Sequence, residues 1–330
     1  MDISICIPVY NVAPYLKRCL DSLFTQDFEG TFEVICVDDA STDDSFSILT
    51  DYQRDEPRLK VMQLPERKKI SVVRTTALQA ASGNYIMQVD SDDWLQQGAL
   101  AALHRKCMET GADIVVYDYL VDDSGEWIQD RHFKEDGLFR ENKSKIQPIF
   151  NGAACCKVVK RALIADLLFY KLNVSWGDDF LFNTEILLKA ESICLLPAAY
   201  YVYCINQQSI TYSIRKSEYE MLEDRIASVD ATSEMLHRFS ASYQHKLSLL
   251  NYHKYKLLIL LLRVSNRDAV REKQLIRLAD SMRRLPEMTK RGRLNVSLTI
   301  KYPLYALIYM AFRIDFKQAL GVFYNKYIKR

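Results

Sequence analysis

The first 90 residues alternate between short apolar, β-branched runs and stretches whose apolar residues recur at helical spacing. The candidate strands are residues 2–11, 32–37, 59–64 and 85–89, and the candidate helices are residues 15–24, 45–52 and 72–81. In the first of these helices Leu16, Cys19, Leu20 and Leu23 share one face, as in a helix that packs on a sheet. Strands and helices that alternate at this length predict βαβ crossovers and a mostly parallel sheet.

Polar side chains follow three of these strands where each strand ends. Tyr10 and Asn11 end the first strand, Asp38 and Asp39 the second, and residues 90–93 (Asp-Ser-Asp-Asp) the fourth. We expect these groups to converge, because open α/β sheets bind ligands at the carboxyl ends of their strands. Three carboxylates within four residues favour a bound cation, and Mg²⁺ or Mn²⁺ binds through one or two carboxylates plus substrate phosphates. The cluster therefore predicts a metal-bridged phosphate site, and the alternative is a solvated loop or a helix N-terminal cap.

The glycine-rich loops of other phosphate-binding proteins are missing from the sequence. No G-x-G-x-x-G follows the first strand, and no G-x-x-x-x-G-K-[ST] occurs. Both absences count against a dinucleotide oxidoreductase and a P-loop NTPase. With only ten glycines in 330 residues, the chain is expected to bind phosphate through a metal and side chains.

Four segments in order resemble the family 2 glycosyltransferases, which have the GT-A nucleotide-diphospho-sugar transferase fold. The segments are Ile5–Asn11 (ICIPVYN), Val37–Asp43 (VDDASTD), Ala81–Asp93 (ASGNYIMQVDSDD) and Trp176–Phe182 (WGDDFLF). The resemblance covers about residues 1–215 and implies an α/β domain with a Rossmann-like mixed sheet flanked by helices. Residues 216–330 would then form a helical, basic C-terminal extension.

The resemblance also implies roles for individual residues. The nucleotide-sugar site would comprise Pro8, Tyr10, Asp38, Asp39, Arg74, Asp90 and Ser91. Within it, Asp39 would accept a hydrogen bond from the base and Arg74 would lie near the diphosphate. Asp92 would bind Mn²⁺ or Mg²⁺, and Asp179 would be the catalytic general base. The acceptor side would include Asp178, Trp176 and Lys157.

The chain departs from the family pattern at two of these positions. Arg74 is followed by Thr75-Thr76-Ala77, where the family usually has Asn followed two residues later by Gly. Asp178 stands where the family usually has Glu, and its side chain is one methylene shorter.

The chemistry of sugar transfer explains why these residue types are needed. Negative charge accumulates on the leaving diphosphate, and a divalent cation held by Asp92 would stabilise it. The acceptor hydroxyl must lose its proton as it attacks, so a carboxylate is needed as general base. One base and one metal suffice for a direct displacement with inversion. Asp178-Asp179, at the start of an apolar helical run, fit that base, and the alternative is that both cap the helix.

Cysteine placement and the start of the chain bear on its compartment. Of the eight cysteines, Cys6 and Cys36 lie inside predicted strands, Cys155 and Cys156 are adjacent, and no C-x-x-C occurs. This pattern favours neither a disulfide framework nor a zinc site. The sequence begins directly with a strand and shows no signal-peptide pattern. We therefore expect a cytoplasmic protein, at the inner face of the membrane if its tail binds lipid.

Basic charge is concentrated toward the C-terminus. The net charge is +2, but from Arg271 onward 14 Lys and Arg face only 4 Asp and Glu. The same region holds the apolar segment Tyr302–Phe312, which is too short to span a bilayer but suited to an anionic membrane surface. The alternative is a core helix packed on the transferase domain. No nucleic-acid-binding module accompanies the basic residues, so nucleic acid is not an expected partner.

Residues 218–267 contain no Gly or Pro and have a helical apolar period. This pattern predicts two long helices, either as an oligomer interface or packed beside the acceptor cleft.

Together with these patterns, the resemblance to family 2 glycosyltransferases implies an inverting hexosyl- or N-acetylhexosaminyltransferase with a UDP-linked donor. The acceptor would be a hydroxyl of a glycan or lipid-linked molecule in surface polysaccharide synthesis. Two other functions remain open: a metal-dependent phosphohydrolase or nucleotidyltransferase that uses the same carboxylates, and a non-catalytic, membrane-bound assembly partner.

Overall fold

The computed structural model describes residues 1–123, 126–130, 136–140, 153–175, 177–206 and 209, together with single helical positions between 224 and 238. The chain divides into two compact units, Met1–Arg215 and Lys216–Arg330. The fold described below is that of the first unit. Most of the predicted helices of residues 218–267, and the whole segment Tyr302–Phe312, lie outside the described residues. No helix among the described residues is long and apolar enough to cross a membrane.

The first four strands and three helices alternate along the chain as predicted. The strands are β1 (Ile3–Val9), β2 (Phe32–Asp38), β3 (Leu59–Gln63) and β4 (Tyr85–Gln88), and the helices are α1 (Ala13–Phe24), α2 (Ser45–Asp55) and α3 (Ile70–Ala80). Their boundaries differ by only a few residues from those expected from periodicity. The predictions for this part of the chain are therefore confirmed.

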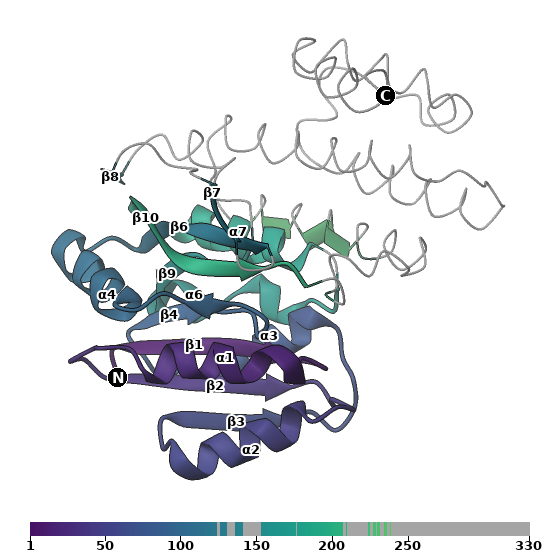
Figure 1. The fold of residues 1–330 in the computed structure, drawn as a ribbon. Coiled ribbons are helices and arrows are strands. Elements are labelled where there is room, and N and C mark those ends of the chain that lie inside the picture. The colour runs from purple at the N-terminus through teal and green to yellow at the C-terminus, as the bar shows by residue number, and fades with distance from the viewer. Residues whose placement is uncertain are drawn as a thin grey trace, which may run out of the picture. The chain divides into compact units, whose positions relative to one another are not determined.

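The second half of the unit adds elements of more varied length. They are β5 (Trp94–Leu95), α4 (Ala99–Thr110), β6 (Ile114–Asp123), β7 (Glu126–Asp130), β8 (Gly137–Phe139), β9 (Lys157–Lys160), α6 (Arg161–Ile164), the 3₁₀ helix η2 (Leu168–Lys171), α7 (Asp178–Lys189) and β10 (Ile193–Cys204). Within the described ranges, ten strands form one sheet whose main order is β3-β2-β1-β4-β9-β6-β10-β5 (Figure 1). β1 pairs in parallel with β2 and β4, whereas β9 runs antiparallel between β4 and β6. The sheet is therefore mixed, as the GT-A resemblance implies.

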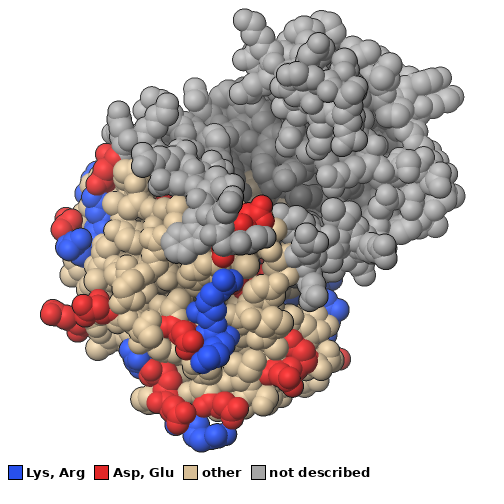
Figure 2. Space-filling model, in the orientation of Figure 1, with Lys and Arg blue, Asp and Glu red and all other residues tan. Residues whose placement is uncertain are grey.

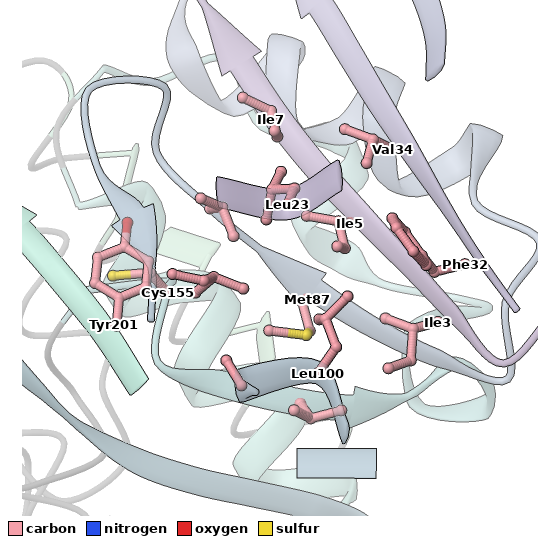
Figure 3. Close-up of a cluster of buried hydrophobic side chains, with 14 of the residues drawn as sticks. Ile3, Ile5, Ile7, Leu23, Phe32, Val34, Met87, Leu100, Cys155 and Tyr201 are labelled. Atoms are coloured by element: carbon pink, nitrogen blue, oxygen red, sulfur yellow. The ribbon is translucent and has the colours of Figure 1, made fainter. Parts of the chain in front are cut away.

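The core includes β1 and β2, which lie beside the edge strand β3 in the sheet order. All seven residues of each strand are buried. Ile3, Ile5 and Ile7 of β1 belong to one apolar cluster with the buried face of α1, and Figure 3 shows these three side chains spaced along the strand, with that of Ile5 beside Leu23 of the helix. β3, at the edge of the sheet, buries only Leu59 among its five residues. The two strands whose ends carry part of the predicted site are thus buried along their whole length.

The turn before β4 explains the glycine in the segment Ala81–Asp93. A Cβ atom on Gly83 would lie 2.6 Å from the backbone nitrogen of Ser4 and 2.7 Å from the carbonyl carbon of Ile3. The backbone N–H of Gly83 also donates a hydrogen bond to Ser4 Oγ at 2.7 Å. Only glycine allows β4 to begin this close to β1, because it has no side chain to displace the neighbouring backbone.

Candidate active site

The carboxyl ends of β1, β2 and β4 meet at one edge of the sheet, as expected from the strand pattern. The backbone N–H of Asp39 donates to the carbonyl of Val9 at 2.8 Å, and that of Val89 donates to the carbonyl of Cys6 at 3.1 Å. These bonds continue the parallel pairing to the point where each strand ends. Tyr10, Asp39 and Asp90 therefore all lie at the carboxyl ends of these parallel strands.

The loop between β3 and α3 contacts two of the residues predicted to bind the nucleotide. The Arg67 guanidinium lies 4.2 Å from the centroid of the Tyr10 ring, and Asp39 Oδ1 accepts a hydrogen bond from the backbone N–H of Lys68 at 2.6 Å. Burial raises the pKa of Asp39, while the Lys68 N–H opposes that shift. The loop between β3 and α3 thus packs on both residues. Arg67 was not singled out by sequence, because its contact with Tyr10 depends on that loop.

The other predicted donor residues on these strands are buried. Asp38 Oδ2 accepts hydrogen bonds from the backbone N–H of Ser41 at 3.1 Å and from Gln63 Nε2 at 3.2 Å. Pro8 lies opposite Val37 in the parallel register of β1 and β2, and Ser91 is 6% exposed. Asp38 therefore supports the turn that follows β2.

The acidic cluster divides into groups with different surroundings. Asp93 is 1% exposed, and its carboxylate accepts hydrogen bonds from the Tyr201 hydroxyl at 2.5 Å and from the backbone N–H of Cys204 at 2.8 Å. The Tyr201 hydroxyl in turn accepts a hydrogen bond from the backbone N–H of Asp90 at 3.1 Å. Burial, with the negative charges of Asp90 and Asp92, raises the pKa of Asp93. Asp93 thus fastens the cluster to β10 and leaves Asp90 and Asp92 for the site.

Asp92 is the carboxylate best placed to hold a metal. It is partly exposed, and its Oδ2 accepts a hydrogen bond from Asn206 Nδ2 at 2.9 Å. Burial and the charge of Asp90 raise the pKa of Asp92, so a cation beside it would relieve an unfavourable field. Among the described residues no group of three or more His, Cys, Asp or Glu could hold a metal by itself. The residues present fit Mn²⁺ or Mg²⁺, which completes its shell with phosphate oxygens and water.

Arg74 of α3 lies among three carboxylates. Its side chain is 7% exposed, and its Nη2 lies 3.0 Å from Asp90 Oδ1 and 3.5 Å from Asp179 Oδ1. Its Nε lies 3.1 Å from Asp178 Oδ2, and its Nη1 donates to Gln88 Oε1 at 3.2 Å. Burial disfavours the guanidinium charge, but the three carboxylates outweigh this and raise the pKa of Arg74. Sequence reasoning named all four ionic groups without predicting that they meet.

The sharp start of α7 places Asp178 and Asp179 in its first turn. Gly177, just before the helix, has a φ of +85°, which favours glycine over any residue with a side chain. Asp178 has an 8% exposed side chain, and burial together with the charge of Asp179 raises its pKa to about 8, with Arg74 opposing. The side chain of Asp179 is 38% exposed. Desolvation also raises the pKa of Asp179, and Arg74 again opposes. Both carboxylates are therefore stronger bases than an ordinary aspartate, and Asp179 is the more accessible of the two.

The predicted acceptor side is described only in part, because Trp176 lies outside the described residues. Lys157 is 4% exposed, and its Nζ donates to the carbonyls of Ala153 at 2.6 Å and Cys155 at 3.2 Å. Burial lowers the pKa of Lys157, while the negative charge of Asp179 opposes that shift. Lys157 therefore braces the backbone of Ala153 and Cys155 from a buried position.

Several known proteins are similar to this chain. Glycosyltransferase GlyA of Streptococcus pneumoniae is 32% identical over 63% of this chain and 31% of its own length. The poly(ribitol-phosphate) beta-glucosyltransferase of Bacillus spizizenii is 30% identical over 70% of this chain and 37% of its own. The chain thus spans about a third of the length of these two relatives.

A solved structure shows the same architecture, and a family model matches the N-terminal half. S. aureus TarS 1-349, in complex with UDP-GlcNAc, matches with a TM-score of 0.75 and 22% identity over 95% of this chain and 92% of its own. This likeness confirms the GT-A type α/β fold. The model described as "Glycosyl transferase family 2" matches residues 4–168. Since that match spans half of the 330 residues, the chain belongs to glycosyl transferase family 2.

Proposed function

We propose that the chain is an inverting, metal-dependent glycosyltransferase. It moves a sugar from a UDP-linked donor to a hydroxyl of a glycan or lipid-linked acceptor in surface polysaccharide synthesis. The observation that carries the proposal is the position of Asp179: Arg74 joins this accessible carboxylate to the acidic cluster that follows β4. A base on one side of the sugar and a diphosphate site on the other are what a single displacement requires.

Different residues of the chain would bind the donor and activate the acceptor. Tyr10, Arg67 and Asp39 would bind the nucleotide, since they lie beyond the carboxyl ends of β1 and β2, where the loop before α3 contacts both strand ends. Asp92 would hold Mn²⁺ or Mg²⁺, which when bound stabilises negative charge on the leaving diphosphate. Asp179 Oδ2 or Oδ1 would accept the proton of the attacking hydroxyl, and positioned proton transfer of this kind contributes roughly 10²- to 10⁴-fold in rate.

Relatives support the choice of donor and acceptor class. TarS has been solved with UDP-GlcNAc and with UDP, and two relatives are named for transferring glucose or N-acetylglucosamine to poly(ribitol-phosphate). We therefore favour a UDP-hexose or UDP-N-acetylhexosamine and a hydroxyl-rich polymer or its lipid-linked precursor. All eight cysteines are buried free thiols, which suits work in the reducing cytoplasm.

The test is calorimetric titration of UDP into the wild type and Asp92→Asn, with and without Mn²⁺. We expect binding that needs the metal and that weakens at least tenfold in Asp92→Asn. Asp51→Asn, an exposed change on α2, is the matched control and should bind like the wild type. Binding that is indifferent to Mn²⁺ and to Asp92 would contradict the metal-dependent mechanism. Release of phosphate from UDP without sugar transfer would instead indicate a phosphohydrolase.

A further inference from the structure

Arg74 connects elements that contribute to opposite sides of the site. It is on α3, while its ionic partners follow β4 (Asp90) and begin α7 (Asp178 and Asp179). Each of the three guanidinium nitrogens of Arg74 lies within 3.2 Å of a protein oxygen. Nη1 is near Gln88 Oε1, Nη2 is near Asp90 Oδ1, and Nε is near Asp178 Oδ2. A guanidinium offers five N–H donors in a fixed fork. Here the fork donates hydrogen bonds to Gln88 and Asp90, its Nε is ion-paired with Asp178, and the side chain is only 7% exposed, which leaves little of its surface for a diphosphate.

A second set of contacts fixes α3 to the segment that leads into α7. Ser71 Oγ donates to the carbonyl of Leu172 at 3.2 Å and accepts a hydrogen bond from the backbone N–H of Val174 at 2.8 Å. The backbone N–H of Ser71 donates to the carbonyl of Val174 at 3.2 Å. α3 therefore holds both the chain just before α7 and, through Arg74, the first turn of α7 itself.

A buried carboxylate in the second half of α7 adds to these contacts. Glu185 is fully buried, and its two carboxylate oxygens accept hydrogen bonds from the backbone N–H groups of Leu168 at 2.7 Å and Phe169 at 2.9 Å. These bonds tie α7 to η2. Because η2 also contacts α3, these bonds connect α7 to the helix that carries Arg74.

We propose that Arg74 is a positioning residue that holds the general base Asp179 in register with the donor-side carboxylate Asp90, and that it is not a ligand of the diphosphate. This inference rests on the proposed function. A shift of about 1 Å between the base and the donor site is enough to slow a displacement strongly. Holding both carboxylates on one guanidinium prevents such a shift.

The experiment compares Arg74→Lys with the wild type in two assays. One is UDP release from UDP-glucose and from UDP-N-acetylglucosamine with water as acceptor, and the other is calorimetric binding of UDP with Mn²⁺. Lysine keeps the charge but has one nitrogen in place of the planar fork, so it cannot reproduce the separate Nη1, Nη2 and Nε contacts of Arg74. We expect kcat to fall at least tenfold, while the donor KM and the Kd for UDP stay within threefold of wild type.

Arg58→Lys is the matched control. Arg58 also makes a forked pair, through Nε and Nη2 to Glu56, but it precedes β3 at the opposite edge of the parallel strands. We expect this variant to keep the wild-type kcat. Asp178→Asn is the second test in case Arg74→Lys does not fold. It removes the charge facing Nε and should lower kcat at least threefold without changing UDP affinity.

The outcomes separate this inference from the function on which it rests. If Arg74→Lys or Asp178→Asn keeps the wild-type kcat, Arg74 does not position the base. If Arg74→Lys raises the Kd for UDP tenfold, Arg74 serves the diphosphate and the inference is overturned. If the wild type neither binds UDP nor releases it from either donor, the proposed function fails and the inference fails with it.

Discussion

Asp90, Asp92 and Asp93 lie within four residues of the chain, yet the surroundings of each carboxylate differ. Asp90 faces Arg74, Asp92 remains partly exposed beside Asn206, and Asp93 is enclosed by Tyr201 and Cys204 of β10. Local spacing predicts that carboxylates gather at this edge. Local spacing does not predict which carboxylate is buried and hydrogen-bonded within the fold, because that depends on β10, about 110 residues further along the chain.

Tyr201→Phe tests how the acidic cluster is held. The change removes the hydroxyl that donates to Asp93 and accepts from the backbone N–H of Asp90. We expect a loss of about 1–3 kcal/mol in the free energy of unfolding, since a buried carboxylate loses a hydrogen bond. Mn²⁺-dependent UDP affinity should fall as well. Tyr200→Phe on the same strand is the control, and equal behaviour of both variants in urea unfolding and UDP calorimetry would contradict this role.

Asp179→Asn tests the assignment of the base. The variant should keep UDP affinity and lose about 10²- to 10⁴-fold in kcat, because the amide cannot accept the acceptor's proton. In the wild type the base works only when ionised, and the pKa of Asp179 is raised. As the pH is lowered, kcat should therefore begin to fall at a pH above the ordinary pKa of aspartate, about 3.9. An unchanged kcat in Asp179→Asn would assign the base elsewhere.

At the level of elements, short-range periodicity was sufficient for β1 to β4 and α1 to α3, whose residues alternate in a regular way. It was not sufficient for the strand order. β9 inserts antiparallel between β4 and β6, and β10 pairs with β6, β5 and β8. These pairings join residues far apart in sequence, so no local pattern contains them. The meeting of Arg74 with the carboxylates of α7 escaped prediction for the same reason.

Glu33 has a buried carboxylate whose contacts connect secondary-structure elements and include no residue of the candidate site. It lies at the start of β2, away from the site edge, and accepts hydrogen bonds from Ser4 Oγ at 2.6 Å and from Ser82 N and Oγ at 2.8 and 2.6 Å. Lys60 Nζ lies 2.5 Å from its other oxygen. One side chain thus joins β1, β2, β3 and the turn before β4.

Glu33→Gln should lower stability in a pH-dependent way. Burial alone would raise the pKa of Glu33, but the hydrogen bonds from Lys60, Ser4 and Ser82 lower it from 4.5 to about 2. A folded-state pKa below the unfolded value stabilises the protein above about pH 4.5, and this contribution is lost as the pH falls toward 2. At pH 7 the variant should lose about 2 kcal/mol in urea unfolding. Exposed Glu29→Gln is the control, and a pH-independent difference between Glu33→Gln and wild type would contradict the linkage.

The whole chain distributes its charge unevenly. On the described face in Figure 2, acidic and basic side chains are interspersed, whereas the sequence from Arg271 onward carries 14 basic against 4 acidic residues. A lipid-linked acceptor would lie at a membrane surface, so we propose that the C-terminal region brings the transferase to anionic lipid. Each Lys or Arg near such a surface contributes about 1 kcal/mol.

Sedimentation of the full chain with vesicles tests this proposal. We expect binding to vesicles that contain phosphatidylglycerol, little binding to pure phosphatidylcholine, and weaker binding as salt rises. Lys326→Gln, Lys329→Gln and Arg330→Gln combined should weaken binding more than tenfold, since three charges contribute about 3 kcal/mol. The matched triple Lys17→Gln, Arg54→Gln and Arg105→Gln changes the net charge equally at exposed positions of the first unit. If both triple variants weaken binding alike, the attraction comes from net charge and not from the C-terminal region. If the wild type binds neither kind of vesicle, the C-terminal region does not bring the transferase to lipid and the proposal is wrong.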